Sequence, residues 1–313
     1  MTGSRQIVTE QPPDLSLARR IRRFIYRSRE DKCQILRLRL KQLWSMLFPR
    51  IPLPVRLPYG GWWLARNDFS GDMVFKGGCD EAERRFVQSW LRPGMVVLDV
   101  GAHNGFYTLL ASRRVGSMGA VVAFEPSPRE RKRLLTHLKL NRCKNVRVEN
   151  FALADVKCEA KLFVVQGRGT GLNSLRRPPV EESIERVDVR VTTLDDYLQS
   201  SDLAAVDLIK MDVEGGELAV LKGATALLGR YPRPVFLCEV EDARTKPWGY
   251  EATEIVEFLS HLDYEWFLPT ANGCLSVSPS EQTSYQTNLV AVPKERRSQL
   301  MSWPHAIRME QLG

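Results

Sequence analysis

Positions 97–105 read Val97-Leu98-Asp99-Val100-Gly101-Ala102-His103-Asn104-Gly105, an apolar strand pattern followed by a glycine-bearing turn. The two glycines let the backbone bend sharply and let a ligand approach it closely. The turn lacks the middle glycine that a dinucleotide fold needs beside its pyrophosphate. It therefore favours a ligand without phosphates, and S-adenosylmethionine is one such ligand. The predicted contacts are the carboxylate of Asp99 and the turn residues Gly101, Ala102, His103, Asn104 and Gly105.

The next two predicted strands also end in polar groups. Glu125 lies 26 residues after Asp99, where an α/β fold places the acid that binds the ribose hydroxyls. Asn150 ends the following strand, and with the backbone of the residues after it, including Ala152, it is predicted to face the adenine. Three such signals in order indicate one cofactor site. The alternative is that these residues only cap helices and form turns.

From Met95 onward, short β-branched runs alternate with amphipathic helical runs, which predicts an α/β fold with a mostly parallel seven-stranded sheet and helices on both faces. The predicted strands are 96–100, 121–125, 146–150, 207–212, 235–240, 264–268 and 288–292. The predicted helices are 106–114, 128–140, 217–228 and 253–261. An insertion after the third strand is expected to add strands at 161–165 and 187–191 and an exposed loop at 166–183.

The sequence predicts three segments before this core. A helical pattern runs from Asp14 to Phe48, and Pro52, Pro54 and Pro58 then predict a stiff linker. Residues 59–80, including 69–75, indicate a hairpin or edge ribbon. A helix over 80–91 follows, with Asp80 as its N-cap and Pro93-Gly94 as its stop. The predicted division is thus 1–58, 59–94, a cofactor-binding domain at 95–293 and a tail at 294–313.

Positive charge is concentrated at the N-terminus. Residues 1–56 hold 13 Lys and Arg against 4 Asp and Glu, whereas the remaining 257 residues hold 32 against 33. The helical pattern places one apolar set on a single face, opposite six arginines, and a second set follows: Leu17, Ile21, Phe24 and Ile25, then Leu36, Leu40, Leu43, Trp44 and Leu47. This basic amphipathic extension has three interpretations: it binds an anionic membrane surface, it binds a partner enzyme, or it packs on its own domain.

Composition excludes several classes of protein. With 313 residues, 43% hydrophobic and 26% charged, the chain is expected to fold and not to be disordered or collagen-like. The longest apolar runs stop well short of the roughly 18 residues that a membrane-spanning helix needs. Six scattered cysteines, and no secretory signal ahead of them, favour a reducing, cytoplasmic location, with peripheral membrane attachment as an option. Because the core carries no basic excess, no nucleic-acid partner is expected.

The block Asp207-Leu208-Ile209-Lys210-Met211-Asp212-Val213-Glu214-Gly215 carries the predicted chemistry. If the strand stays extended, Lys210, Asp212 and Glu214 alternate onto one side at the edge where ligands bind, next to the cofactor. Asp212 is both a predicted cofactor contact and the first candidate for a general base, with Lys210 as its ion-pair partner and a further candidate catalytic residue. Glu214 either shares this role or caps the following helix. Asp212, Glu214 and Glu239 could instead hold a divalent cation such as Mg²⁺. His103 is either an acid/base group or a histidine that orients the turn, and His137 is expected on a surface helix.

The turn at 97–105, the Ala123-Phe124-Glu125-Pro126 segment and the 207–215 block resemble the FkbM family of S-adenosylmethionine-dependent methyltransferases. The resemblance extends to Leu194-Asp195-Asp196-Tyr197-Leu198 and to Val220-Leu221-Lys222-Gly223-Ala224. It implies a class I, Rossmann-like methyltransferase fold and O-methylation of sugars, glycolipids or natural-product hydroxyls. Two positions depart from the family pattern: His103, where Asn is frequent, and Gly216, where Ala is common.

Together, these features predict an S-adenosylmethionine-dependent O-methyltransferase acting on a hydroxyl of a glycan, glycolipid or related metabolite. A small natural-product acceptor is one alternative. A non-catalytic, membrane-attached scaffold that keeps the cofactor fold is another. Methylation of nucleic-acid bases is disfavoured, because the segment after the fourth strand has no Asn or Asp followed by Pro-Pro and an aromatic residue.

Overall fold

The structure is a computed structural model of the whole chain, and it describes residues 29–48, 50–75, 81–203, 205–270, 273–277 and 284–301. The helical pattern predicted over 14–28, with its first apolar set, and the predicted N-cap Asp80 lie outside these residues. None of the helices in the described ranges is both long enough and apolar enough to cross a membrane.

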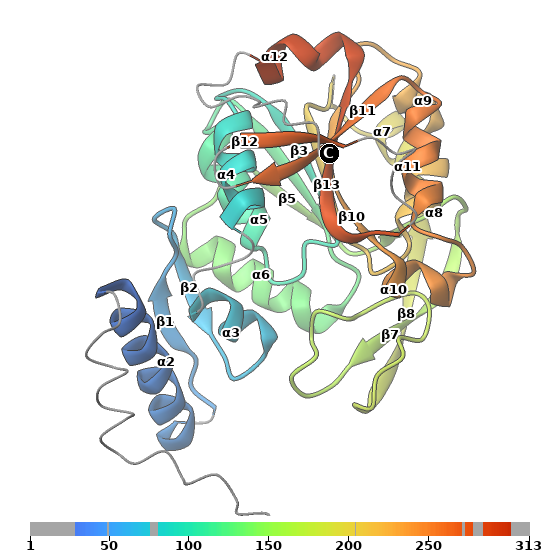
Figure 1. Cartoon of the computed structure of the whole chain (residues 1–313). Coiled ribbons are helices and arrows are strands. Elements are labelled where there is room, and N and C mark those ends of the chain that lie inside the picture. Colours follow the sequence, from blue (N-terminus) through green and yellow to red (C-terminus); the bar gives the residue numbers. More distant parts are fainter. Residues whose placement is uncertain are drawn as a thin grey trace, which may run out of the picture.

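The core is one mixed sheet with the order β12-β11-β13-β10-β9-β3-β4-β5 (Figure 1). Strands β5, β4, β3, β9 and β10 run parallel, whereas β13 lies antiparallel between β10 and β11. The bounds are β3 Val96–Val100, β4 Ala120–Phe124, β5 Val146–Glu149, β9 Leu208–Met211, β10 Val235–Glu241, β11 Tyr264–Thr270 and β13 Gln286–Pro293. The seven predicted strands are therefore confirmed. The sequence analysis missed the edge strand β12 (Gly273–Val277), which pairs with β11.

Alternation along the strands buries both faces of this sheet. Leu98 and Val100 of β3 pack on one side with the helices α7, α8, α9 and α11, while Val97 packs on the other side with α4 and α5. Helix α6 joins the second group (Figure 1). The bounds are α4 Glu81–Trp90, α5 Phe106–Val115, α6 Pro128–Leu140, α7 Leu194–Gln199, α8 Glu217–Lys222, α9 Thr225–Leu228 and α11 Thr253–Ser260. Short elements complete this region: α10 Asp242–Thr245, α12 Arg297–Met301 and 3₁₀ turns at Lys246–Trp248 and Lys294–Arg296.

The predicted helix over 217–228 is two helices, α8 and α9. The break falls at Gly223, where a Cβ atom would lie 2.1 Å from the carbonyl oxygen of Ala154. The insertion forms the three-stranded sheet β6-β8-β7, with β6 at Ala152–Leu153, β7 at Cys158–Val165 and β8 at Ile184–Thr192. The two inserted strands are thus confirmed and are longer than predicted. Residues 166–183 form a loop, interrupted by one bridge between Phe163 and Ser174.

The segment before the core differs from its prediction in two places. The proline-rich stretch is not only a linker, because Leu53–Arg56 form β1, which pairs with β2 (Trp62–Ala65) in a hairpin. Pro54 is tolerated there because β1 is an edge strand. The ribbon predicted over 69–75 is wrong: Phe69–Phe75 form helix α3, whose first turn is capped by Asp68 through the Gly71 N–H at 3.0 Å. Helix α2 (Arg29–Leu47) lies beside β1 and α3 (Figure 1).

Candidate functional site

A cavity of about 720 Å³ opens at the carboxyl ends of the parallel strands. The turns after β3, β4, β5, β9 and β10 line it, and helix α3 and the insertion loop add further walls. Open α/β sheets bind ligands at this edge because the loops there diverge and leave a crevice. Of the predicted cofactor contacts, all except Asn150 and Gly105 line this cavity.

The turn after β3 depends on its glycines. Gly101 has φ +80°, and a Cβ atom there would lie 1.8 Å from the carbonyl oxygen of Asp212. The N–H groups of Gly101 and Ala102 both donate to the Phe124 carbonyl, at 3.1 and 3.0 Å. The turn is therefore held against β4 on one side and the end of β9 on the other. This close approach is the physical reason for glycine at position 101. Gly105, at φ +89°, ends the turn at the start of α5 and does not line the cavity.

Two buried carboxyls, both predicted cofactor contacts, line one side of the cavity. Asp99 accepts a hydrogen bond from the Thr108 hydroxyl, and burial raises the pKa of Asp99 to about 6. Glu125 accepts the backbone N–H groups of His103 and Ser127 at 2.7 and 2.8 Å. Burial, reinforced by the charge of Glu130, raises the pKa of Glu125 to about 8. Glu125 thus shapes the turn while lining the cavity.

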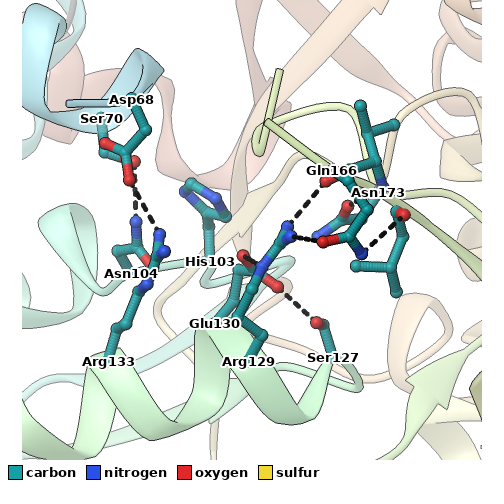
Figure 2. A network of polar contacts seen from close by, with 12 residues as sticks. Asp68, Ser70, His103, Asn104, Ser127, Arg129, Glu130, Arg133, Gln166 and Asn173 are labelled. Atoms are coloured by element: carbon teal, nitrogen blue, oxygen red, sulfur yellow. Dashed lines mark hydrogen bonds and ion pairs between the residues drawn. The ribbon is translucent and has the colours of Figure 1, made fainter. Parts of the chain in front are cut away.

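His103 and Asn104 form the wall between these carboxyls and helix α3. His103 has φ +49°, its Nε2 lacks a hydrogen-bond partner among the described residues, and burial lowers its pKa. The Asn104 amide donates to the Ser70 hydroxyl at 2.7 Å, as Figure 2 shows. Both residues line the cavity, so His103 presents its ring to this space.

The prediction for Asn150 is wrong in its placement. Its side chain is exposed and accepts a hydrogen bond from Arg190 at 2.9 Å, which holds it outside the cavity. The neighbours Phe151 and Ala152 line the cavity instead. The Phe151 ring packs on Phe124, with ring centroids 5.7 Å apart, and presents a flat apolar surface. Phe151 could have been predicted from the sequence, because it is an aromatic residue just past the strand end and aromatic rings suit contact with a planar base.

Three carboxyls meet on the other side of the cavity. Asp212, Glu214 and Glu239 each bring one oxygen to within 4.8 Å of the other two. Lys210, 3% exposed, donates to Asp212 at 3.0 Å; burial lowers the pKa of this lysine, but the carboxylate of Asp212 outweighs it, so the pKa is raised. Strand alternation predicted that Lys210, Asp212 and Glu214 lie together, and Glu239 was predicted to join them from the end of the next strand; all four line the cavity.

A residue that the sequence analysis missed completes this cluster. Arg244, from α10, forms an ion pair with Glu214, with Nε and Oε2 3.0 Å apart. Oε2 of Glu239 is buried and has no partner within the described part of the chain. Burial, and next the nearby charge of Asp212, raise the pKa values of Glu214 and Glu239. The cluster therefore holds more carboxyls than cations and is poised to accept a proton or bind a cationic or hydroxyl-bearing group.

The backbone after β9 is held in an unusual conformation. Glu214 has φ +56°, and its carbonyl accepts hydrogen bonds from Ser174 Oγ at 2.9 Å and Trp248 Nε1 at 3.1 Å. Glu214 does not cap helix α8, whose N-cap is Gly216 with no side-chain bond. The side chain of Glu214 points to Arg244 and the cavity instead. Local packing also explains glycine at position 216, because a Cβ atom there would lie 3.1 Å from the Trp248 ring.

His137 does not lie on a surface helix face. It is 3% exposed, its ring stacks on Trp63 with centroids 3.9 Å apart, and Nε2 accepts the Leu64 N–H at 3.2 Å. Its Nδ1 therefore carries the proton that is shared with the Asn104 carbonyl at 2.8 Å. Because burial lowers its pKa to about 4, the ring is neutral at physiological pH. His137 supports the wall that carries Asn104.

Residues 99–266 match the methyltransferase FkbM domain, which is more than half of the chain. The chain belongs to the FkbM methyltransferase family. The resemblance seen in its motifs is thereby confirmed, as is the family's S-adenosylmethionine-dependent methyltransferase fold. No curated protein matches the sequence.

Solved structures with a similar fold are distant in sequence. An FkbM methyltransferase from Methylobacillus flagellatus KT is 17% identical with a TM-score of 0.42, and the match covers 73% of this chain and 56% of that one. The chain thus spans little more than half the length of that relative. A rRNA methylase described as putative, from Clostridium thermocellum, is 10% identical with a TM-score of 0.42, covering 67% and 94%. A Streptococcus mutans protein described as a putative methyltransferase, in complex with SAH, is 13% identical with a TM-score of 0.40, and the match covers 67% of this chain and 94% of that one.

Proposed function

We propose that this FkbM methyltransferase transfers a methyl group from S-adenosylmethionine to a hydroxyl of a glycan, glycolipid or related metabolite. The observation that carries the proposal is the carboxyl cluster of Asp212, Glu214 and Glu239, which shares one cavity with Asp99 and Glu125. Methyl transfer to an alcohol needs a base for the hydroxyl proton and a site that aligns the oxygen. The same cavity contains the candidate base and the carboxyls that are proposed to bind the cofactor.

In this mechanism, four residues have distinct roles in binding and proton transfer. S-adenosylmethionine, when bound, supplies an electrophilic methyl group on a sulfonium. Asp99 is suited to its ammonium group and Glu125 to its ribose hydroxyls. Asp212 takes the proton of the acceptor hydroxyl as the new O–CH₃ bond forms and the S–CH₃ bond breaks. Lys210 orients Asp212 through their 3.0 Å ion pair.

The same three carboxyls are also a candidate site for a divalent cation such as Mg²⁺. Lys210 and Arg244 already place two positive charges on the cluster, at 3.0 Å from Asp212 and from Glu214. These ion pairs favour base catalysis over metal assistance. Methyl transfer is therefore expected to continue in excess EDTA.

Aromatic side chains support a glycan acceptor. Phe69 of α3 lines the cavity although its side chain is 57% exposed, and Trp248 lines it under the guanidinium of Arg176, 5.5 Å from the ring centroid. Flat apolar surfaces beside a few charged groups suit a ligand that has both C–H and hydroxyl faces. A small natural-product hydroxyl is the second candidate acceptor, and it would fit the same walls.

Calorimetric titration with S-adenosylmethionine tests the proposal first. Asp99→Asn is expected to weaken binding by about 10- to 100-fold, because a charged hydrogen-bond partner is lost. Since the pKa of Asp99 is about 6, its carboxylate is present at pH 7.5 and largely protonated at pH 5. Wild-type affinity is therefore expected to fall as the pH is lowered between these two values, and the Asn variant should show a smaller fall.

The matched control is Asp155→Asn, an exposed carboxylate outside the cavity, which should bind as tightly as wild type. Labelled-methyl transfer to a panel of glycans and glycolipids then identifies the acceptor. Absence of binding by the wild-type protein would remove the proposal. Binding without turnover on any hydroxyl acceptor would favour the scaffold alternative.

We further propose that helix α2 binds an anionic membrane surface. Its apolar face does not pack on the protein, because the stripe Leu36, Leu40, Leu43 and Leu47 is more than half exposed. The opposite face of the helix contacts the protein: Lys41 is buried and pairs with Asp72 of α3.

Two exposed cations lie close to this apolar stripe: Arg39, next to Leu40, and Arg50, just past the end of the helix. Leucines can thus enter the bilayer surface while these cations meet lipid phosphates. The idea that the helix packs its apolar face on its own domain is therefore wrong for this segment.

Vesicle sedimentation checks this attachment. Leu40→Ser with Leu43→Ser is expected to reduce binding to phosphatidylglycerol vesicles by about tenfold or more, since each leucine contributes about 1.5 to 3 kcal/mol when buried. The control is Met118→Ser with Leu135→Ser, two exposed apolar residues elsewhere on the surface. Equal vesicle binding by both double variants would contradict the proposal and leave a partner enzyme as the better explanation.

A further inference from the structure

A second cavity, of about 210 Å³, lies between strand β2 and helix α6. It shares three lining residues with the large cavity: Trp63, Ser70 and Asn104. The hydrogen bond from Asn104 to Ser70, drawn in Figure 2, forms part of the wall between the two. A ligand in the large cavity therefore has this second space directly beside it.

The walls of the second cavity are strongly basic. Four cations line it, Arg66, Arg129, Lys132 and Arg133, against the single carboxylate of Asp68. That carboxylate is already engaged, since one oxygen accepts the Gly71 N–H at 3.0 Å. Its other oxygen accepts a hydrogen bond from Arg133 at 2.9 Å (Figure 2). Asp68 is thus occupied by capping α3 and by pairing with one of the four cations.

Two of the four cations, Arg66 and Lys132, have no side-chain partner among the described residues, unlike Arg129. Arg129 is engaged: each nitrogen of its guanidinium donates one hydrogen bond, to Glu130, to Gln166 and to the Val165 carbonyl, and these bonds connect the insertion to α6. By contrast, the side chains of Arg66 and Lys132 make no hydrogen bond or ion pair with any described residue. Burial, and next the like charge of Arg133, lower the pKa of Arg66. The charge of Asp68 partly opposes this shift, and both Arg66 and Lys132 are exposed at the edge of the cavity, so their side chains are free to meet an incoming anion.

We infer that the second cavity binds an anionic group, a phosphate, sulfate or carboxylate, carried by the acceptor of methyl transfer. Arg66 and Lys132 contact the anion, and the N–H groups of Arg133 that do not bind Asp68 add a second guanidinium, which suits such oxygens. The anion site stands on its own observations, whereas its assignment to the acceptor rests on the proposed function. Within that function, it narrows the acceptor from glycans and lipids in general to those that carry an anionic group.

Titration with inorganic phosphate tests the site. The variant Arg66→Gln with Lys132→Gln is expected to bind phosphate at least about tenfold more weakly than wild type, because two charged contacts are lost. The control is Lys139→Gln with Lys144→Gln, which removes the same charge from exposed positions outside the cavity. Equal affinities of the two double variants, or no phosphate binding by wild type, would overturn the inference.

Two further probes identify the carrier of the anion. Glucose 6-phosphate binding more tightly than glucose, with loss in the Arg66/Lys132 variant, assigns the site to a soluble glycan phosphate. The same loss seen with phosphatidic acid vesicles, and not with glucose 6-phosphate, assigns it to a lipid headgroup. If neither probe depends on Arg66 and Lys132, the assignment of the anion to an acceptor is refuted.

Titration with S-adenosylmethionine separates this inference from the proposed function. The Arg66/Lys132 variant is expected to bind S-adenosylmethionine as tightly as wild type, with or without saturating phosphate. A wild-type protein that binds phosphate at these residues but does not bind S-adenosylmethionine would refute the proposed function and leave the anion site intact. Competition between phosphate and S-adenosylmethionine would instead place the anion in the large cavity and overturn the inference.

Discussion

Replacing Asp212 with asparagine is expected to lower kcat by about 100- to 10,000-fold, the range by which a positioned general base accelerates proton transfer. The asparagine keeps the size of the side chain and an oxygen that can accept the Lys210 ammonium, whose nitrogen lies 3.0 Å from Asp212 Oδ2. The fold and the cavity should therefore persist while the base is lost. Steady-state rates with the acceptor found by labelled-methyl screening provide the measurement.

Two readouts distinguish a lost base from a damaged site. The melting temperature of Asp212→Asn should stay near the wild-type value, and its affinity for S-adenosylmethionine should fall by far less than its kcat. The matched control is Asp188→Asn, an exposed carboxylate in the insertion that also pairs with a lysine. A kcat within tenfold of wild type for Asp212→Asn would show that the proton leaves by another group, and Glu239, with its unpartnered buried oxygen, would then be the next to replace.

Gly101→Ala is expected to lower the free energy of unfolding by about 3 to 5 kcal/mol. One part of this cost is the left-handed φ of +80°, and the larger part is overlap of the new Cβ with the Asp212 carbonyl oxygen, 1.8 Å away. The overlap is with backbone, so no side chain can move aside to relieve it. Chemical denaturation measures the change.

Gly94→Ala is the matched control. Gly94 has φ +88°, nearly the same backbone conformation, but no atom lies within 4 Å of the position its Cβ would take. The free energy of unfolding of Gly94→Ala should therefore fall only by the cost of placing alanine at a left-handed φ, about 1 to 2 kcal/mol. Equal losses for the two variants would show that the turn after β3 moves away from β9 without cost, and that the close approach at position 101 does not hold the site together.

Much of the fold could be predicted because it depends on local patterns. The strand of period two at 96–100, the turn glycines and the helix of period 3.6 at 106–114 are encoded within a few neighbouring residues. Order along the chain then places Asp99, Glu125 and Asp212 at one sheet edge, because right-handed crossovers return each parallel strand to the same end. The β12 edge strand and helix α3 were missed since neither has a long periodic pattern: α3 has only seven residues and depends on the cap by Asp68.

The site required more than these patterns. Asn150 and Phe151 are adjacent, and only the bond from Arg190 of β8 shows which of the two faces away from the cavity. Arg244 reaches Glu214 from a short helix 30 residues further on, and Ser174 holds the Glu214 carbonyl from the insertion loop. None of these pairs has a fixed sequence spacing, because a loop of any length can bring them together.

The sequence alone determined the order of strands along the chain, the carboxyls at the strand ends and the family, since each follows from residues close together in the chain. Only the tertiary structure decided which charges are neutralised and which are not. Arg129 and Arg66 are both arginines near α6, yet one is engaged by Glu130 and the insertion while the other faces a cavity without a partner in the described chain. That difference depends on contacts between elements distant in sequence, and it is what turns a basic surface into a candidate binding site.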